Sequence, residues 1–281
     1  MRTNSPAVSR RDRNRAATRT EIKQTALDLM RERGTTEVRF TDIARVMGLT
    51  PPALYRYYAD RDELLTEMIT DGYQDLAAAL AAAGETYAGT RLQAVGFAYR
   101  AWALEDPQRF ALIFGLPVPG YAAPQEGPTV EAAKRAMANL AAVVGSAAAD
   151  GTLGHPLITQ VAPVLAVELC ERKNYPGFVE GEVPDGSASS RPDGATELSQ
   201  HEIAPATHQA MLTCWAGLHG FTCLEAYGHL DWFSEQAREE LFRAQLALAA
   251  ISMGISTAVV DDITAGPGEP GAVPLSRAEP G

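Results

Sequence analysis

The side chains best suited to chemistry lie in one stretch, GLTPPALYRYYADRDELL, at residues 48–65. Tyr55, Arg56, Tyr57 and Arg61 place hydroxyl and guanidinium donors close together. Tyrosine hydroxyls and Arg61 suit phosphate oxygens, and Arg56 has the reach and the donors to bind the edge of a guanine. These residue types therefore favour contact with a nucleic acid. The alternative is that the tyrosines only pack in the core and on the surface.

A short helix must present these donors, and two adjacent prolines mark where it starts. Thr50 is a good N-cap, and Pro51 takes the first helical position, where a missing N–H costs nothing. Pro52 is still in the first turn and is tolerated there. The prolines therefore start a helix instead of breaking one, and we predict that it runs from Ala53 to about Tyr58.

The spacing within this helix separates an inner face from an outer one. Leu54 and Tyr58 lie four residues apart and are expected to face the core. Tyr55 and Arg56 then face outward, together with Thr50 one turn earlier. Prolines and the small Ala53 allow the backbone of the helix start to approach a partner closely.

Two further helices precede this one. Apolar residues at helical spacing predict a helix from Arg15, which Gly34 ends in the left-handed conformation. A short helix follows over residues 41–47, and Gly48 makes the turn. Three helices with a tight glycine turn form a helix-turn-helix, in which the N-terminal end of the second element of the motif points into the major groove.

The charge distribution fits a polyanionic partner at one end of the chain. The formal net charge is −11, but residues 1–66 carry 13 Arg and Lys against 9 Asp and Glu, a net charge of +4. The remaining 215 residues carry 11 against 26, a net charge of −15. A basic end on an acidic body indicates a nucleic-acid contact at that end. The alternative for the first residues is a solvated, disordered arm.

Residues 15–66 resemble a known family. FTDIARVMGLTPPALYRYYADRDELL is similar to the DNA-binding signature of the TetR family of transcriptional regulators. The resemblance implies an all-helical, homodimeric, ligand-responsive repressor whose partners are double-stranded operator DNA, a second copy of itself and an unknown small molecule. By position, the phosphate and base contacts of the family fall on Arg39, Thr41, Thr50, Pro51, Ala53, Tyr55, Arg56, Tyr57 and Arg61.

Two positions depart from the family pattern. Arg39 stands where the N-cap of the second helix is usually Thr or Ser. Either Thr41 caps a shortened helix, or the cap is lost at about 1 kcal/mol. Tyr57 stands where the family usually has His, so one hydrogen bond remains available and the base preference is expected to change.

The whole chain is predicted to be all-α, with an N-terminal helix-turn-helix and a C-terminal helical domain for ligand binding and dimerisation. The predicted divisions are a disordered basic arm at 1–14, the DNA-binding domain at 15–62, the regulatory domain at 63–255 with a mobile loop at 174–200, and a disordered tail at 256–281. Beyond a long fourth helix that ends near Ala83, helices are predicted at 90–105, 107–115, 128–149, 157–172, 204–228 and 231–254.

A second resemblance lies at WAGLHGFTCLEAYGHL, residues 215–230, which is similar to the WHG subtype of TetR-like regulators. DPQRFALIFG, residues 106–115, also has a counterpart there. Glycines let another helix approach closely, and the apolar majority suits a helix packed on two sides. We therefore predict a dimer interface from the last two helices, with Trp215, Gly217, Gly220, Phe221, Leu241 and Leu248.

Aromatic residues on consecutive predicted helices are candidates for an apolar ligand pocket. The candidate pocket residues are Phe97, Trp102, Phe110, Phe114 and, on a later helix, His219. Core packing explains the aromatic residues about as well. For His219 the competing interpretation is a hydrogen-bonded core histidine.

Other activities lack a signal in the sequence. It contains no GxSxG, phosphate loop, HExxH or dinucleotide-binding glycines, and its histidines do not cluster at metal spacing. We therefore expect no enzyme, cofactor or metal. No apolar run approaches the roughly 20 residues of a membrane span, and three cysteines without CxxC spacing fit a reducing cytoplasm. The alternative function is a ligand-binding protein or enzyme that uses its helical domain without sequence-specific DNA binding.

Overall fold

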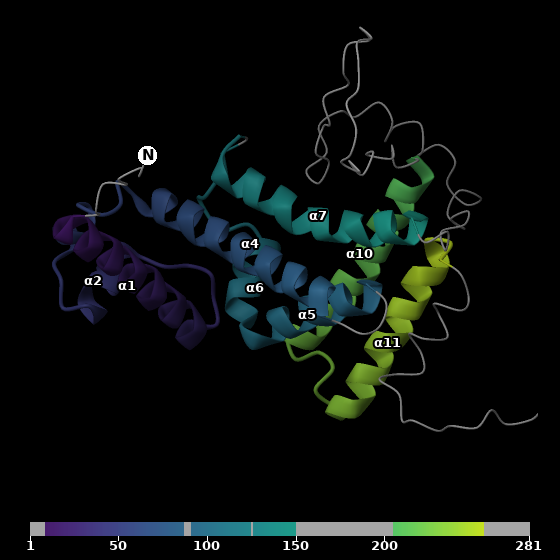
Figure 1. Cartoon of the computed structure of the whole chain (residues 1–281). Helices are drawn as coiled ribbons and strands as arrows, with labels where there is room; N and C mark the ends of the chain where they lie inside the picture. The colour runs from purple at the N-terminus through teal and green to yellow at the C-terminus, as the bar shows by residue number, and fades with distance from the viewer. Residues whose placement is uncertain (1–8, 87–90, 125, 150–204, 256–281) are drawn as a thin grey trace, which may run out of the picture.

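The computed structural model describes residues 9–86, 91–124, 126–149 and 205–255, and every element of regular structure within them is an α-helix (Figure 1). An N-terminal group, formed by a long first helix, two short helices and the start of a second long helix, is followed by a larger helical body. The predicted fold class is thereby confirmed. None of the helices in these ranges has the length and apolar character needed to cross a membrane.

The N-terminal part consists of α1 (Arg10–Arg33), α2 (Phe40–Val46), α3 (Pro51–Leu54) and the beginning of α4 (Arg61–Thr86). Gly34 ends α1 with φ of 63°, as predicted, and Gly48 makes the turn after α2 with φ of 66°. One apolar core joins the four helices, because each buries side chains at helical spacing. Its central members are Ile22, Ala26, Met30, Ile43, Leu54, Tyr58, Leu64 and Leu65.

Two predicted boundaries in this part were wrong. Residues 10–14 belong to α1 and not to a disordered arm, because the Ser9 hydroxyl accepts a hydrogen bond from the Asp12 N–H at 3.1 Å and caps the helix. The first turns of α1 are exposed and polar, so apolar periodicity did not reveal them. The helix expected to reach Tyr58 ends at Leu54, and residues 55–57 form a turn. Residues 1–8 lie outside the described residues.

The C-terminal part, which the sequence predicts to be the regulatory part, adds α5 (Arg91–Glu105), α6 (Pro107–Phe114), α7 (Pro128–Ala149), α10 (Pro205–Ala226) and α11 (Glu235–Ser252) to the long α4. Helix α7 lies along α4, and α10 packs beside α11 (Figure 1). The predicted helices of this part are confirmed to within a few residues. The predictions for 157–172, 174–200 and 256–281 lie outside the described residues.

Helix α11 begins at Glu235, four residues later than predicted. Gly228 has φ of 78° and makes a turn after α10, and the Ser234 hydroxyl caps α11 by accepting from the Ala237 N–H at 3.2 Å. The serine cap was present in the sequence but was not recognised as the start signal.

Helix α6 belongs to two cores. Phe110 is fully buried in the core of the C-terminal part, whereas Leu112 is buried in the core of the N-terminal part. Val118, in the loop after α6, is also buried with the N-terminal helices. A displacement of α6 would therefore change the packing in both cores.

Candidate nucleic-acid interface

The reading element, defined here as residues 51–57, consists of α3 and the turn that follows it. Thr50 occupies the N-cap position, as predicted, but its hydroxyl makes no capping hydrogen bond. Two prolines remove the first backbone donors of the helix, and the Ala53 N–H bonds to the Thr50 carbonyl at 2.8 Å. Because the Thr50 side chain is exposed and has no capping role, its hydroxyl is available to an external acceptor.

The two faces of the reading element are arranged as predicted. Leu54 is fully buried and Tyr58, just after the element, is 1% exposed, whereas Tyr55 is 58% exposed. Arg56 is exposed as well. The Tyr55 ring packs against Phe40 of α2, with centroids 5.2 Å apart, so it is held in place while its outer edge stays in solvent.

Helix α2 carries two more predicted contacts, Arg39 and Thr41, and both are exposed. The helix begins at Phe40, with Arg39 in the N-cap position and no side-chain capping bond. Of the two alternatives for this unusual position, loss of the cap therefore holds. An ion pair of 2.7 Å between Arg33 and Asp42 ties the end of α1 to α2, and this hydrogen bond is the main reason why the pKa of Asp42 is lowered.

Arg61 is a predicted contact whose guanidinium already has a hydrogen-bond partner within the chain. Its guanidinium donates to the Pro119 carbonyl at 2.9 Å and lies 3.6 Å from Asp62, and about a third of the side chain is exposed. The structure thus joins Arg61 to the loop after α6 and does not leave it on the outward face. Nothing in the local sequence signals this contact, which links residues 58 positions apart.

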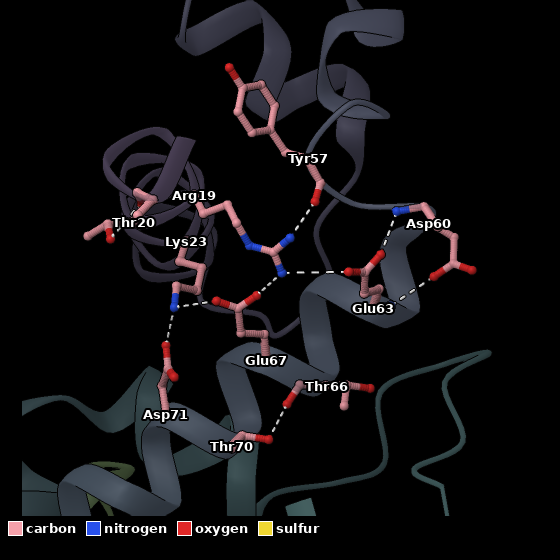
Figure 2. A network of polar contacts seen from close by, with 12 residues as sticks. Arg19, Thr20, Lys23, Tyr57, Asp60, Glu63, Thr66, Glu67, Thr70 and Asp71 are labelled. Atoms are coloured by element: carbon pink, nitrogen blue, oxygen red, sulfur yellow. Dashed lines mark hydrogen bonds and ion pairs between the residues drawn. The ribbon is translucent and has the colours of Figure 1, made fainter. Parts of the chain in front are cut away.

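Tyr57 is held from α1. Arg19 donates to the Tyr57 carbonyl at 2.6 Å, and the Arg15 guanidinium lies 5.6 Å from the centre of the Tyr57 ring. Figure 2 shows the carbonyl directed at Arg19 and the Tyr57 hydroxyl pointing away from the polar network. Tyr57 is half-buried against the N-terminal core, and its predicted DNA contact stays a prediction.

The polar network between α1 and α4 was missed by the sequence analysis. Arg19 and Lys23 of α1 pair with carboxylates of α4 that recur every fourth residue, namely Glu63, Glu67 and Asp71 (Figure 2). Burial opposes ionisation of Glu67, but hydrogen bonds from Lys23 and Arg19 outweigh it and lower its pKa. The spacing of four on both helices was the signal available in the sequence.

A second set of polar contacts joins the N-terminal, predicted DNA-binding part to the C-terminal, predicted regulatory part. Arg31, in the last turn of α1, donates to Asp106 at 3.3 Å through Nε. Asp106 is buried and also caps α6 by accepting from the Arg109 N–H at 3.1 Å. Burial raises the pKa of this carboxyl, but the hydrogen bonds from Arg31 and Arg109 lower it by more, so that the net shift is downward. In addition, the hydroxyls of Thr66 and Tyr121 are 3.0 Å apart.

The predicted pocket residues do not form one group. Phe110, Phe114 and His219 come together: the His219 ring centre lies 5.7 Å from that of Phe110 and 5.3 Å from that of Phe114. The Tyr99 hydroxyl is 2.7 Å from Nδ1 of His219, and burial lowers the pKa of this histidine. The remaining two lie elsewhere. The Phe97 ring packs against Phe242 at 5.3 Å, and Trp102 lies beneath the guanidinium of Arg109 at 4.8 Å.

The predicted dimer residues also divide. Gly217 and Gly220 of α10 are exposed, and so are Leu241 (39%) and Leu248 (58%) of α11. Trp215 and Phe221 instead turn toward the subunit core, where Trp215 stacks on His219 with ring centres 5.3 Å apart and Phe221 packs on Phe242 at 5.6 Å. Other exposed apolar residues continue the outer face, namely Leu212, Leu224 and Ile251.

Comparison with known proteins agrees with this arrangement. Residues 22–68 match the family model for bacterial regulatory proteins of the tetR family, and residues 92–249 match the model for the tetracyclin repressor-like C-terminal domain. The HTH-type transcriptional regulators Rv1816 of Mycobacterium tuberculosis and Mb1846 of Mycobacterium bovis are each 44% identical to this chain over 88 residues. The match covers 30% of this chain and spans 38% of the length of these curated relatives.

Solved structures extend the likeness to most of the chain. The crystal structure of SCO4313, described as a regulatory protein, is 32% identical and covers 86% of this chain and 98% of its own, with a TM-score of 0.61. A protein of unknown function from Rhodococcus sp. RHA1 is 21% identical, covers 84% of this chain and 95% of its own, and has a TM-score of 0.56, a likeness of fold alone. The C-terminal family model alone matches more than half of the chain. This chain belongs to the TetR family of bacterial regulatory proteins.

Proposed function

We propose that this chain is a ligand-responsive transcriptional repressor that binds a palindromic operator as a homodimer. The observation that carries the proposal is the outward group on the reading element, where Tyr55 and Arg56 stand exposed beside the unused hydroxyl of Thr50. Its donors match phosphate oxygens and guanine edges. We propose direct DNA contacts for Arg39, Thr41, Thr50, Pro51, Ala53, Tyr55, Arg56 and Tyr57, and for Arg61 only when it leaves the Pro119 carbonyl.

The homodimer would form through the outer face of α10 and α11, defined by the exposed residues Leu212, Gly217, Gly220, Leu224, Leu241, Leu248 and Ile251. Exposed apolar side chains recur along both helices, and clusters of exposed apolar residues mark interaction sites. A two-fold axis would set the same face of both subunits together and place two reading elements on one operator.

The dimer has a test that leaves the subunit intact. A Cβ added at Gly220 meets nothing within 4 Å, so Gly220→Glu fits within the subunit and puts a charge only into the proposed interface. Sedimentation should show monomers for Gly220→Glu and dimers for Ala78→Glu, the matched change at an exposed alanine of α4. A dimeric Gly220→Glu would place the interface elsewhere.

The effector would bind at the aromatic group around Phe110, Phe114 and His219, joined by Tyr99 and Trp215. A small apolar or amphipathic molecule suits these rings and the Tyr99–His219 pair. Because α6 carries Phe110 and Phe114 and is bound through Asp106 to Arg31 of α1, a molecule that shifts α6 would shift the DNA-binding part. The effector must prefer the non-binding arrangement to release the operator.

The C-terminal part is proposed to be of the WHG subtype. Its support is the sequence Trp215-Ala-Gly-Leu-His219-Gly220 together with the stacking of the Trp215 and His219 rings at an interplanar angle of 16°. We also propose that the chain acts in the cytoplasm and has no enzymatic activity, metal or cofactor.

The function is tested by selecting DNA from a random double-stranded library with the purified chain. A repressor of this kind should enrich a palindromic sequence with half-sites about one helical turn apart or somewhat more. Binding to the enriched duplex should fall steeply with salt and should exceed binding to a scrambled duplex. No enrichment and no salt-dependent binding would favour a ligand-binding protein without sequence-specific DNA recognition.

A further inference from the structure

We propose that Arg19 is a positioning residue for DNA recognition, and that it holds the reading element in register with α4 through the Tyr57 carbonyl. The inference rests on the proposed function and adds to it a residue that faces away from DNA. Its starting point is that the reading element has little support of its own. Helix α3 has four residues, its N-cap side chain makes no capping bond, and a helix of this length is not stable by itself.

The guanidinium of Arg19 binds three groups at once. One terminal nitrogen donates to the Tyr57 carbonyl at 2.6 Å, and the other donates to the Glu67 carboxylate and lies 3.6 Å from Glu63. The group also lies over the Tyr58 ring, with its carbon 4.2 Å from the ring centre. A planar fork of donors is needed for this combination, because an ammonium is a point charge that cannot span the carbonyl and the carboxylate in the same way.

The carboxylate that holds Arg19 is itself held. Glu67 also accepts from Lys23 at 2.8 Å, and Lys23 pairs in turn with Asp71 (Figure 2). Glu63 accepts a bond of 2.6 Å from the Ala59 N–H, in the link between the reading element and α4. Arg19 thus lies between α1 and α4 and, through the Tyr57 carbonyl, fixes the backbone of the reading element relative to both helices.

The anchored atom is close to the proposed DNA contacts. Tyr57 is the last residue of the reading element, and its ring has Arg15 of α1 at 5.6 Å while its carbonyl binds Arg19. Arg15 and Arg19 are one helical turn apart, so α1 holds Tyr57 at the ring and at the backbone. Loss of the Arg19 bond would free the carbonyl, and the outward side chains of Tyr55 and Arg56 would lose their fixed orientation toward a groove.

The test compares two variants of the same network. Arg19→Lys keeps the charge and a partner for Glu67 but cannot also hold the Tyr57 carbonyl. Lys23→Met removes two ion pairs of that network but touches no atom of the reading element. Each is titrated with the duplex selected by the parent chain and with a scrambled duplex. Urea unfolding and amide hydrogen exchange of residues 53–58 are measured on the same samples.

For Arg19→Lys we expect about a tenfold or larger decrease in affinity for the selected duplex, with affinity for the scrambled duplex nearly unchanged. Amides of residues 53–58 should exchange faster in this variant alone. Lys23→Met should decrease the urea midpoint by at least as much as Arg19→Lys does. It should nevertheless keep the parent's preference for the selected duplex. Glu67→Gln weakens the carboxylate contact that holds Arg19. Its preference for the selected duplex should therefore lie between those of Arg19→Lys and Lys23→Met.

Parent-like discrimination and exchange in Arg19→Lys would overturn the inference, and so would an equal decrease of discrimination in Lys23→Met. The failure of the proposed function looks different. In that case the parent itself would not distinguish the selected duplex from the scrambled one. The exchange of residues 53–58 would still report whether Arg19 holds the reading element.

Discussion

Two seams of this molecule are built from opposite chemistry. Between α1 and α4, the contact is ionic, with Arg19 and Lys23 set among Glu63, Glu67 and Asp71. Between α6 and α10, the contact is aromatic, with the rings of Phe110 and Phe114 against His219 and Trp215 at centroid distances of 5.3 to 5.7 Å. The first seam lies behind the reading element, and the second lies in the regulatory part.

The difference shows what each seam is suited to do. Hydrogen-bonded ions act over short distances and in fixed directions, so the ionic seam can hold a single backbone carbonyl in place. Aromatic pairs adopt both offset-stacked and edge-to-face geometries, which suits the second seam to the effector site proposed above. Helix α6 packs into both cores, so a rearrangement of the aromatic seam would also move residues that pack against the N-terminal helices.

The largest effect is expected from breaking the aromatic seam. Phe110 is fully buried, and Phe110→Ala should lower the free energy of unfolding by about 3–5 kcal/mol. Urea unfolding with an unchanged slope measures this decrease. Lys23→Met in the ionic seam should cost no more than about 1 kcal/mol, since partly exposed ion pairs contribute little. Equal costs for the two variants would remove the energetic distinction between the seams.

The next effect concerns the surface that the ionic seam supports. Tyr55→Ala should weaken binding to the selected duplex by about 1–3 kcal/mol, because the variant can no longer make a specific hydrogen bond to the DNA. Tyr55→Phe keeps the packing on Phe40 and removes only the hydroxyl, so it separates the hydrogen bond from the ring packing. Fluorescence anisotropy titrations measure both. Unchanged affinity in Tyr55→Ala would mean that this face of the reading element does not meet DNA.

The two seams should lose their contributions to stability in different pH ranges. Burial lowers the pKa of His219, so the unfolded chain binds a proton first as pH falls below about 6.5, and stability decreases from there downward. The pKa of Glu67 is also lowered, but its contribution is complete above the unfolded value near 4.5 and is lost only as pH falls through the folded value.

Urea midpoints between pH 7 and pH 3 measure these contributions. His219→Gln should remove part of the slope that begins below about pH 6.5, and Glu67→Gln should remove part of the slope below about pH 4.5. A His219→Gln profile that matches the parent between pH 7 and 5 would show that the histidine is not held neutral by burial.

The smallest effect is expected at the start of α1. Arg10 and Arg11 are exposed in its first turn, where they suit phosphate contacts that carry no sequence information. The double change to alanine should reduce the slope of log affinity against log salt by about 1 for each phosphate that is no longer neutralised. The preference for the selected duplex over the scrambled one should stay the same. An unchanged slope would show that these arginines do not touch DNA.

Local signals in the sequence predicted much of this arrangement, and long-range contacts account for what they missed. The paired prolines, Gly34 and the four-residue spacing of Leu54 and Tyr58 each act within one or two helical turns, and the structure places them as predicted. The bond from Arg19 to the Tyr57 carbonyl spans 38 residues, and the bond from Arg61 to the Pro119 carbonyl spans 58. Every residue has a backbone carbonyl, so residue types do not indicate which carbonyl accepts a long-range hydrogen bond.

The inward turn of Trp215 and Phe221 was missed for a related reason. The sequence of α10 has apolar residues on all sides of the helix. Periodicity therefore could not distinguish the side that meets the subunit core from the side that meets solvent or a partner. Gly217, Gly220, Leu212 and Leu224 stand on the outer side, whereas Leu218 and the aromatic residues face the subunit core. The direction of each side chain depends on packing against α5 and α6, which lie about 100 residues earlier in the chain, and against α11.

The most direct test of the account is one titration series with Arg56→Ala, because the central claim is that the reading element recognises DNA sequence. Parent, Arg56→Ala and Lys134→Ala, a matched removal of a cation on α7, are titrated at one salt concentration with selected and scrambled duplexes. We predict that only Arg56→Ala binds the selected duplex more weakly, by about 10- to 100-fold, with little change for the scrambled one. An Arg56→Ala variant that still prefers the selected duplex as strongly as the parent would contradict the account.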